Sequence, residues 1–151
     1  MYKTITASLT LAASLLLSNC ATQISNDPNP PSGPPEATVR ISEFKASYYG
    51  SASTGSGTIR YQGRERRFSI TGIGAGGAGA QTINAVGKVY HLRSLEDFPG
   101  TFTGASSGLT LINGVMHQRF ENANGVVIYL TGETTGLSTS YGIEKIVISF
   151  N

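Results

Sequence analysis

The apolar residues of this chain nowhere follow a 3.6-residue repeat over three helical turns, which argues against a helical domain. They alternate with polar residues in short runs between glycine-containing turns, as in antiparallel strands. The 151-residue chain has 19 glycines and 13% charged residues, a composition typical of strands and tight turns rather than of charged surface helices. We therefore expect a mostly β fold, either a small antiparallel barrel or a strongly curved sheet.

The alternation predicts the strands, and turn residues mark their ends. Val39 and Ile41 alternate with polar neighbours in the first run, and Ile146 and Ile148 share a face in the last. Because the turns are hairpin-short, neighbouring strands should pair antiparallel, and closure into a barrel would remove exposed edges. The predicted strands span 38–44, 57–61, 66–73, 82–92 with a break at Gly87, a segment ending near Phe120, 126–130 and 143–150. The predicted turns and breaks lie at 62–63, 122–125 and 135–136.

A short helical turn is predicted at 94–98. Ser94 stands at the N-cap position with Asp97 three residues later, an arrangement in which the serine hydroxyl caps a backbone N–H. Pro99 and Gly100 should end the turn.

The first twenty residues have the features of an export signal. Lys3 precedes an apolar run, Leu9–Leu17, that is too short to span a bilayer. Residues 17–20, Leu-Ser-Asn-Cys, resemble a bacterial lipobox. We therefore predict that residues 1–19 are a signal peptide and that Cys20, the single cysteine, is acylated with palmitate-type chains on its sulfur and amine. The alternative is an ordinary cleaved signal with an incidental cysteine.

Ala21 rather than Asp follows Cys20, which resembles the pattern of enterobacterial lipoproteins sorted to the outer membrane. The resemblance implies a location at the periplasmic face of that membrane. Residues 20–37 should form a semi-extended tether that holds the domain up to ~50 Å from the membrane, at about 3.1 Å per residue. A single β-rich domain should follow at 38–151. The tether holds five of the six prolines: Pro28, Pro30, Pro31, Pro34 and Pro35.

Two glycine motifs resemble known signatures, but their surroundings differ from those signatures. Residues 72–77 fit G-x-G-x-x-G, yet a strand-like segment follows where a dinucleotide site needs a helix, so we expect a glycine-rich bend. Residues 104–108 fit G-x-S-x-G around Ser106, yet no acid stands between Ser106 and His117. We expect a Gly/Ser surface loop at 104–108.

The two histidines, His91 and His117, lack the spacing of metal ligands. We therefore expect no metal, no cofactor and no catalytic residue, and we do not expect an enzyme. The net charge of +2 gives no strong attraction to nucleic acid.

Four arginines crowd the predicted hairpin around residues 62–63, with Glu65 as the single acid among them. Guanidinium groups bind phosphates, so this hairpin is our candidate contact for lipid phosphates or another anionic envelope polymer. The alternative is a solvated turn whose arginines lie along the surface. The four residues are Arg60, Arg64, Arg66 and Arg67.

Strand alternation divides these arginines between two faces. Arg64 and Arg66 share the face of Phe68, whereas Arg67 lies on the other. Because Phe68 should face the core, Arg66 is expected near the barrel rim or beside a carboxylate.

Three glycine-rich and aromatic segments and one turn carry a resemblance to known proteins: Phe68–Gly77, Gly87–Leu92, Asp97–Phe102 and the Asn-Gly-Val-Val turn at Asn124–Val127. They are similar to a group of uncharacterised proteobacterial envelope lipoproteins, and also to the envelope integrity protein A family and SYLF-type lipid-binding domains. The resemblance implies a small β-rich fold at the envelope that contacts lipid.

These observations leave two main functions open. The first is a non-enzymatic, lipid-anchored protein that binds lipid or another envelope component and supports envelope integrity. The second is a structural or protein-binding lipoprotein without a small ligand. A cavity inside the barrel would favour the first function, and a filled barrel with an apolar outer patch would favour the second. A cleft that gathers histidine and carboxylate would favour an enzyme instead.

Overall fold

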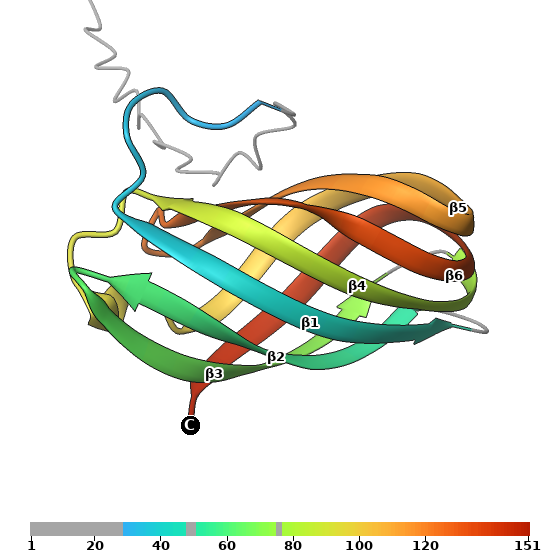
Figure 1. The fold of residues 1–151 in the computed structure, drawn as a ribbon, viewed down its shortest axis with the longest axis horizontal. Helices are drawn as coiled ribbons and strands as arrows, with labels where there is room; N and C mark the ends of the chain where they lie inside the picture. Colours follow the sequence, from blue (N-terminus) through green and yellow to red (C-terminus); the bar gives the residue numbers. More distant parts are fainter. Residues whose placement is uncertain (1–28, 48–50, 75–76) are drawn as a thin grey trace, which may run out of the picture.

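A computed structural model describes residues 29–47, 51–74 and 77–151, and side chains within these ranges except at 43–47, 51–53, 73–74, 77–82, 105–116, 134 and 136–144. Cys20 and most of the predicted tether lie outside the described residues. No helix in the described ranges is long and apolar enough to cross a membrane. The elements are β1 (Ala37–Ser47), β2 (Ser51–Tyr61), β3 (Arg64–Gly74), β4 (Gly77–Tyr90), a 3-10 turn (Leu95–Asp97), β5 (Gly100–Asn122) and β6 (Val127–Phe150) (Figure 1).

The strands form a closed antiparallel barrel, which confirms the predicted fold class. β1 pairs with β2 and β4, and β2 pairs with β3. The long strand β6 pairs with β4 along 127–140 and with β3 along 144–150, while β5 pairs with β6 throughout. The two halves of β5 also meet, since a Cβ on Gly104 would lie 2.5 Å from the carbonyl oxygen of Arg119. β5 and β6 therefore each supply two strands of the eight-stranded barrel.

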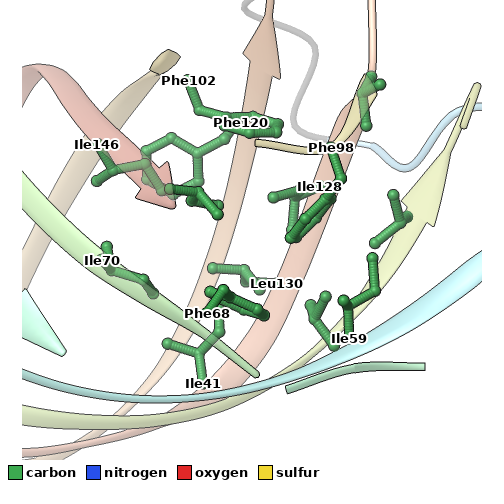
Figure 2. Close-up of a cluster of buried hydrophobic side chains, with 14 of the residues drawn as sticks. Ile41, Ile59, Phe68, Ile70, Phe98, Phe102, Phe120, Ile128, Leu130 and Ile146 are labelled. Atoms are coloured by element: carbon green, nitrogen blue, oxygen red, sulfur yellow. The ribbon is translucent and has the colours of Figure 1, made fainter. Parts of the chain in front are cut away.

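The described core is a cluster of buried hydrophobic side chains between the strands of the barrel (Figure 2). Phe98 follows the 3-10 turn and is fully buried there. Its ring centroid lies 5.3 Å from that of Phe68 in an edge-on contact and 6.0 Å from those of Phe102 and Phe150. Aromatic packing of this kind contributes beyond the area it buries. The 91–99 connection therefore closes one end of the barrel with an aromatic plug.

Glycines that face inward make room for large neighbours, so the described interior is filled. The ring of Phe68 occupies the space where Gly57 would carry a Cβ. A Cβ on Gly87 would lie 2.6 Å from Leu130 Cδ2 and 2.7 Å from Val39 Cγ2. The predicted break at Gly87 is therefore wrong: β4 continues through it, and the missing side chain is replaced by side chains of the neighbouring strands.

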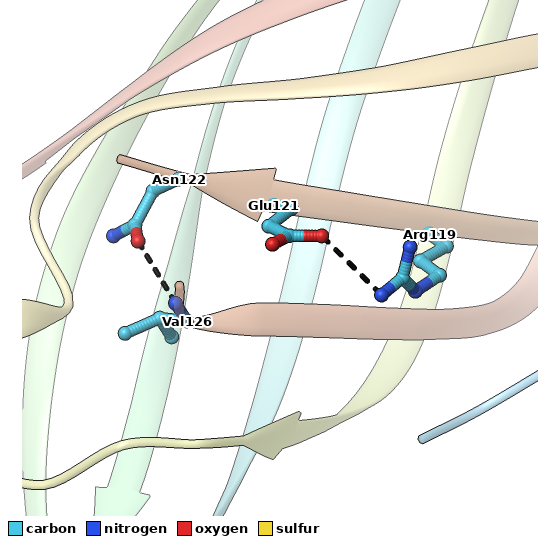
Figure 3. Close-up of polar contacts among 4 residues, drawn as sticks. All are labelled: Arg119, Glu121, Asn122 and Val126. Carbon is cyan, nitrogen blue, oxygen red and sulfur yellow. Dashed lines mark hydrogen bonds and ion pairs between the residues drawn. The ribbon is translucent and has the colours of Figure 1, made fainter. Parts of the chain in front are cut away.

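A buried asparagine joins the β5–β6 turn to the aromatic plug. The Oδ1 atom of Asn122 accepts hydrogen bonds from the backbone N–H groups of Asn124 and Val126, both at 3.0 Å (Figure 3). Its Nδ2 donates to the carbonyl oxygen of Asp97 at 2.9 Å. Asn122 is the buried polar residue of the described core, and its amide satisfies backbone groups that a tight turn leaves unpaired.

The short helical turn is confirmed, but its predicted cap is wrong. The Ser94 side chain caps no backbone N–H; its hydroxyl donates to the Asp97 carboxylate at 3.4 Å. The Asn122 contact with Asp97 holds the turn from the other side.

Two predicted interruptions are also wrong, because the ladder between β5 and β6 is continuous. Residues 104–108 lie within β5, opposite 140–144, and not in a surface loop. Residues 135–136 lie within β6, between β4 and β5. Pairing with a strand on each side overrides the weak strand preference of glycine and serine. The turn at 62–63 is confirmed, with the positive φ angles, 48° and 78°, that a tight two-residue hairpin needs.

Candidate functional site

The four arginines of the predicted site are all exposed, but they do not gather. Arg66 lies opposite the buried Ile59 of β2, on the inward-facing side of β3. Its guanidinium carbon sits 4.0 Å from the centroid of the Phe150 ring, as a cation–π contact. This placement agrees with the rim position expected from alternation. Arg66 therefore covers the edge of the core.

Arg64 is also separated from the outward-facing arginines. It is the first residue of β3 and lies opposite Tyr61, directly after the 62–63 turn. It shares the strand face of Arg66, so the hairpin does not present four arginines to one ligand.

Arg60 and Arg67 face outward, and strand register brings two further bases beside them. Arg67 lies opposite Thr58, which lies opposite Arg40 on β1. Arg60 lies opposite Thr38, which lies opposite Lys88 on β4. Adjacent and diagonal cross-strand neighbours are within reach of long side chains. We call this surface the basic wall: Arg40, Arg60, Arg67 and Lys88, with the hydroxyls of Thr38 and Thr58.

Two grooves on the outer surface meet in the basic wall. The smaller has a volume of about 290 Å³, and it is lined by Thr38, Arg40, Thr58, Arg60 and Glu65. Each arginine in this groove stands opposite a threonine of the neighbouring strand, so the two residue types alternate across β1 and β2. Guanidinium and hydroxyl groups in this arrangement can donate to one anion from two strands.

The larger groove has a volume of about 460 Å³ and shares Thr38 and Arg40 with the smaller one. Val86, which is 59% exposed, and Tyr129 supply an apolar part. Pro30, upstream of β1, lies at its edge. The surface thus changes from cationic over β1 and β2 to partly apolar over β4 and β6.

The bases of this wall are not neutralised by the carboxylates around them. Among the described residues, no carboxylate lies within ion-pair distance of Arg40, Arg60, Arg67 or Lys88. Glu65 stands opposite Arg60 in the ladder without forming such a pair. The nearby ion pair joins Arg119 to Glu121 at 3.3 Å (Figure 3). The bases of the basic wall are therefore not paired with any carboxylate that the structure describes.

The sequence indicated Arg60 and Arg67 but missed Arg40 and Lys88. Alternation with the apolar Val39 and Ile41 could have shown that Arg40 faces outward. It could not show which strands lie beside β1, because the β1–β4 pairing joins residues far apart in the chain.

The remaining chemical candidates are not members of the basic wall, although both contacts of His117 line the larger groove. Ser106 lies in β5, and its side chain is not among those described. His117 Nδ1 lies 3.5 Å from the hydroxyls of Tyr129 and Thr131 on the outer surface. His91 is exposed at the start of the 91–99 connection. No group of three or more His, Cys, Asp or Glu that could hold a metal occurs among the described residues.

The chain matches no protein-family model, no curated protein and no solved structure. The likeness to envelope integrity protein A and SYLF-type domains stays a hypothesis.

Proposed function

We propose that this protein is a non-enzymatic lipoprotein of the bacterial envelope, anchored through Cys20, that binds a phosphate-bearing envelope component on the outside of its barrel. The observation that carries the binding is the basic wall, four outward bases on adjacent strands without a carboxylate partner among the described residues. The lipobox-like sequence at residues 17–20 is the observation that supports the anchor.

The part of the interior that the structure describes is filled, which supports a ligand on the outside rather than within. Phe68, Phe98 and Phe102 are fully buried, and the rings of Phe68 and Phe120 occupy the space beside Gly57 and Gly104. The grooves described above open on the outer surface. A binding protein with such a core presents its ligand site on the barrel wall.

Anion binding is tested by titrating the acylated full chain, held in a non-ionic detergent, with inorganic polyphosphate. The double variant Arg40→Gln/Arg60→Gln should bind about thirtyfold more weakly, because each base near an anionic surface contributes about 1 kcal/mol. Calorimetry at low salt measures the affinity, and raised salt should weaken it.

The matched control is Arg64→Gln/Lys145→Gln, which removes the same charge from exposed positions outside the basic wall. It should keep most of the affinity. Equal losses in the two double variants, or no binding by the unmodified protein, would refute the assigned site. A chain that binds no anion but captures a protein through its outer surface would support the second function instead.

The anchor is tested separately with Cys20→Ser. This variant should carry no acyl chain and should remain uncleaved by the lipoprotein signal peptidase. Mass spectrometry of the purified protein measures both, and acyl chains on the variant would contradict the lipobox assignment.

A further inference from the structure

We propose that the barrel lies side-on against an anionic lipid surface, with the basic wall towards the headgroups, instead of standing away from the membrane on its tether. This inference rests on the proposed function and names its partner: the phosphates of the membrane that holds the anchor.

The first argument is the path of the chain before β1. The segment from Pro30 to Ala37 leaves the turn end of the barrel and bends back above the strands (Figure 1). Pro30 lines the larger groove together with Arg40, Val86 and Lys88. The tether therefore reaches the barrel on the side of the basic wall.

The length of this segment brings the wall close to the anchor. Pro30 stands ten positions after Cys20 in the chain. Fully extended, they span at most about 35 Å, at roughly 3.5 Å per residue. A tether that ends over the basic wall can place this wall at the headgroups without crossing the rest of the barrel.

The second argument is the spread of the bases. Lys88, Arg40, Arg60 and Arg67 lie on four adjacent strands in the order β4, β1, β2, β3. Adjacent strands are about 4.8 Å apart, so the bases extend over about 14 Å. One small phosphate cannot contact all of them, whereas a surface of many phosphates can.

The third argument is the contrast between β4 and the strand half that lies opposite it, which is the next strand after the β3 end of the basic wall. The half of β6 that pairs with β3 lies four strands from β4 in either direction around the barrel. Its described outward residues are Lys145, Val147 and Ser149, so this strand half carries a single described base. An anionic surface would therefore attract one side of the barrel over the other.

The two sides offer a matched pair of reporter positions. Val86 on β4 is 59% exposed and Val147 on β6 is 43% exposed. The chain contains no tryptophan, so Val86→Trp or Val147→Trp introduces a single tryptophan at one of these positions, which can be excited selectively. Each variant, acylated and full-length, is inserted in phosphatidylcholine vesicles that contain brominated lipid, with or without phosphatidylglycerol.

With phosphatidylglycerol, Val86→Trp should lose most of its fluorescence to bromine quenching, and Val147→Trp should keep most of its own. High salt should restore the Val86→Trp signal, because it screens the attraction. Adding Arg40→Gln/Arg60→Gln to Val86→Trp should abolish the difference between the sides. Equal quenching of both reporters, or the same quenching of Val86→Trp without phosphatidylglycerol, would overturn the side-on orientation.

Titration of the same variants with polyphosphate in detergent separates this inference from the proposed function. Binding that depends on Arg40 and Arg60, without a side preference on vesicles, would refute the orientation and leave the function standing. Absence of both would refute the two together.

Discussion

The interior of the barrel and the basic wall are built from alternate residues of the same strands, yet they have opposite character. The interior is apolar and filled, and its buried amide on Asn122 is hydrogen-bonded. The wall carries bases without carboxylate partners among the described residues. Arg66 and Arg67 are neighbours in sequence, but one covers the core edge and the other belongs to the wall. Stability and binding should therefore be separable by substitutions only one residue apart.

The largest expected effect is on the interior side of this comparison. Phe98→Ala removes the aromatic plug, and it should lower the free energy of unfolding by about 3–5 kcal/mol, as for other buried aromatics. Denaturant unfolding measures the loss. Val147→Ala, which shortens an exposed side chain, should change stability by less than about 0.5 kcal/mol. A similar loss in both variants would show that the plug is not a special part of the core.

A smaller loss is expected where the interior holds its polar group. Asn122→Ala leaves the backbone N–H groups of Asn124 and Val126 without their side-chain acceptor, and it removes one of the two side-chain donors to the carbonyl of Asp97. The free energy of unfolding should fall by about 1–3 kcal/mol, the range for unsatisfied buried groups. The exposed Asn124 offers a control, because its side chain donates one bond to Asp97, at 3.2 Å. Asn124→Ala should cost less in the same unfolding measurement, and a larger cost would contradict the role given to Asn122.

The smallest expected effects are on stability at the core edge and on anion binding at the basic wall. Arg66→Gln removes the cation–π contact and should lower stability by about 0.5–1 kcal/mol, with little effect on polyphosphate binding. Arg67→Gln should leave stability unchanged and weaken binding about fivefold, which corresponds to about 1 kcal/mol. Unfolding and calorimetry on both variants give the comparison. If binding depends on Arg66 as strongly as on Arg67, the assignment of Arg66 to the core edge and of Arg67 to the basic wall is wrong.

Alternation was enough to predict a mostly β fold, either a small antiparallel barrel or a strongly curved sheet. It also predicted the inward face of β3, because burial of Phe68 and Ile70 determines which side chains turn outward. It underestimated strand length wherever glycine and serine dominate. Residues 104–108 look like a loop locally, but pairing with β6 draws them into β5. That pairing joins distant residues and leaves no local trace in the sequence.

In the candidate site, too, local alternation predicted some features, whereas distant strand pairing determined the others. Four arginines close in sequence suggested one cluster, but alternation separates Arg66 from Arg67. Arg40 and Lys88 reach Arg60 and Arg67 only through strand register. Exposed bases can be identified from the pattern of a single strand, whereas their assembly into a wall depends on which strands become neighbours.

The pairing of β6 also has a consequence for the order of events when the chain folds. β6 is the last strand of the barrel, and it completes β3, β4 and β5 at once. Before β6 emerges, the phenylalanines of the core lack one side of their enclosure. Such distant pairings make folding slow. If the chain crosses a membrane from its N-terminus, the barrel would therefore stay unfolded until β6 has passed. The barrel would then close in a single cooperative step.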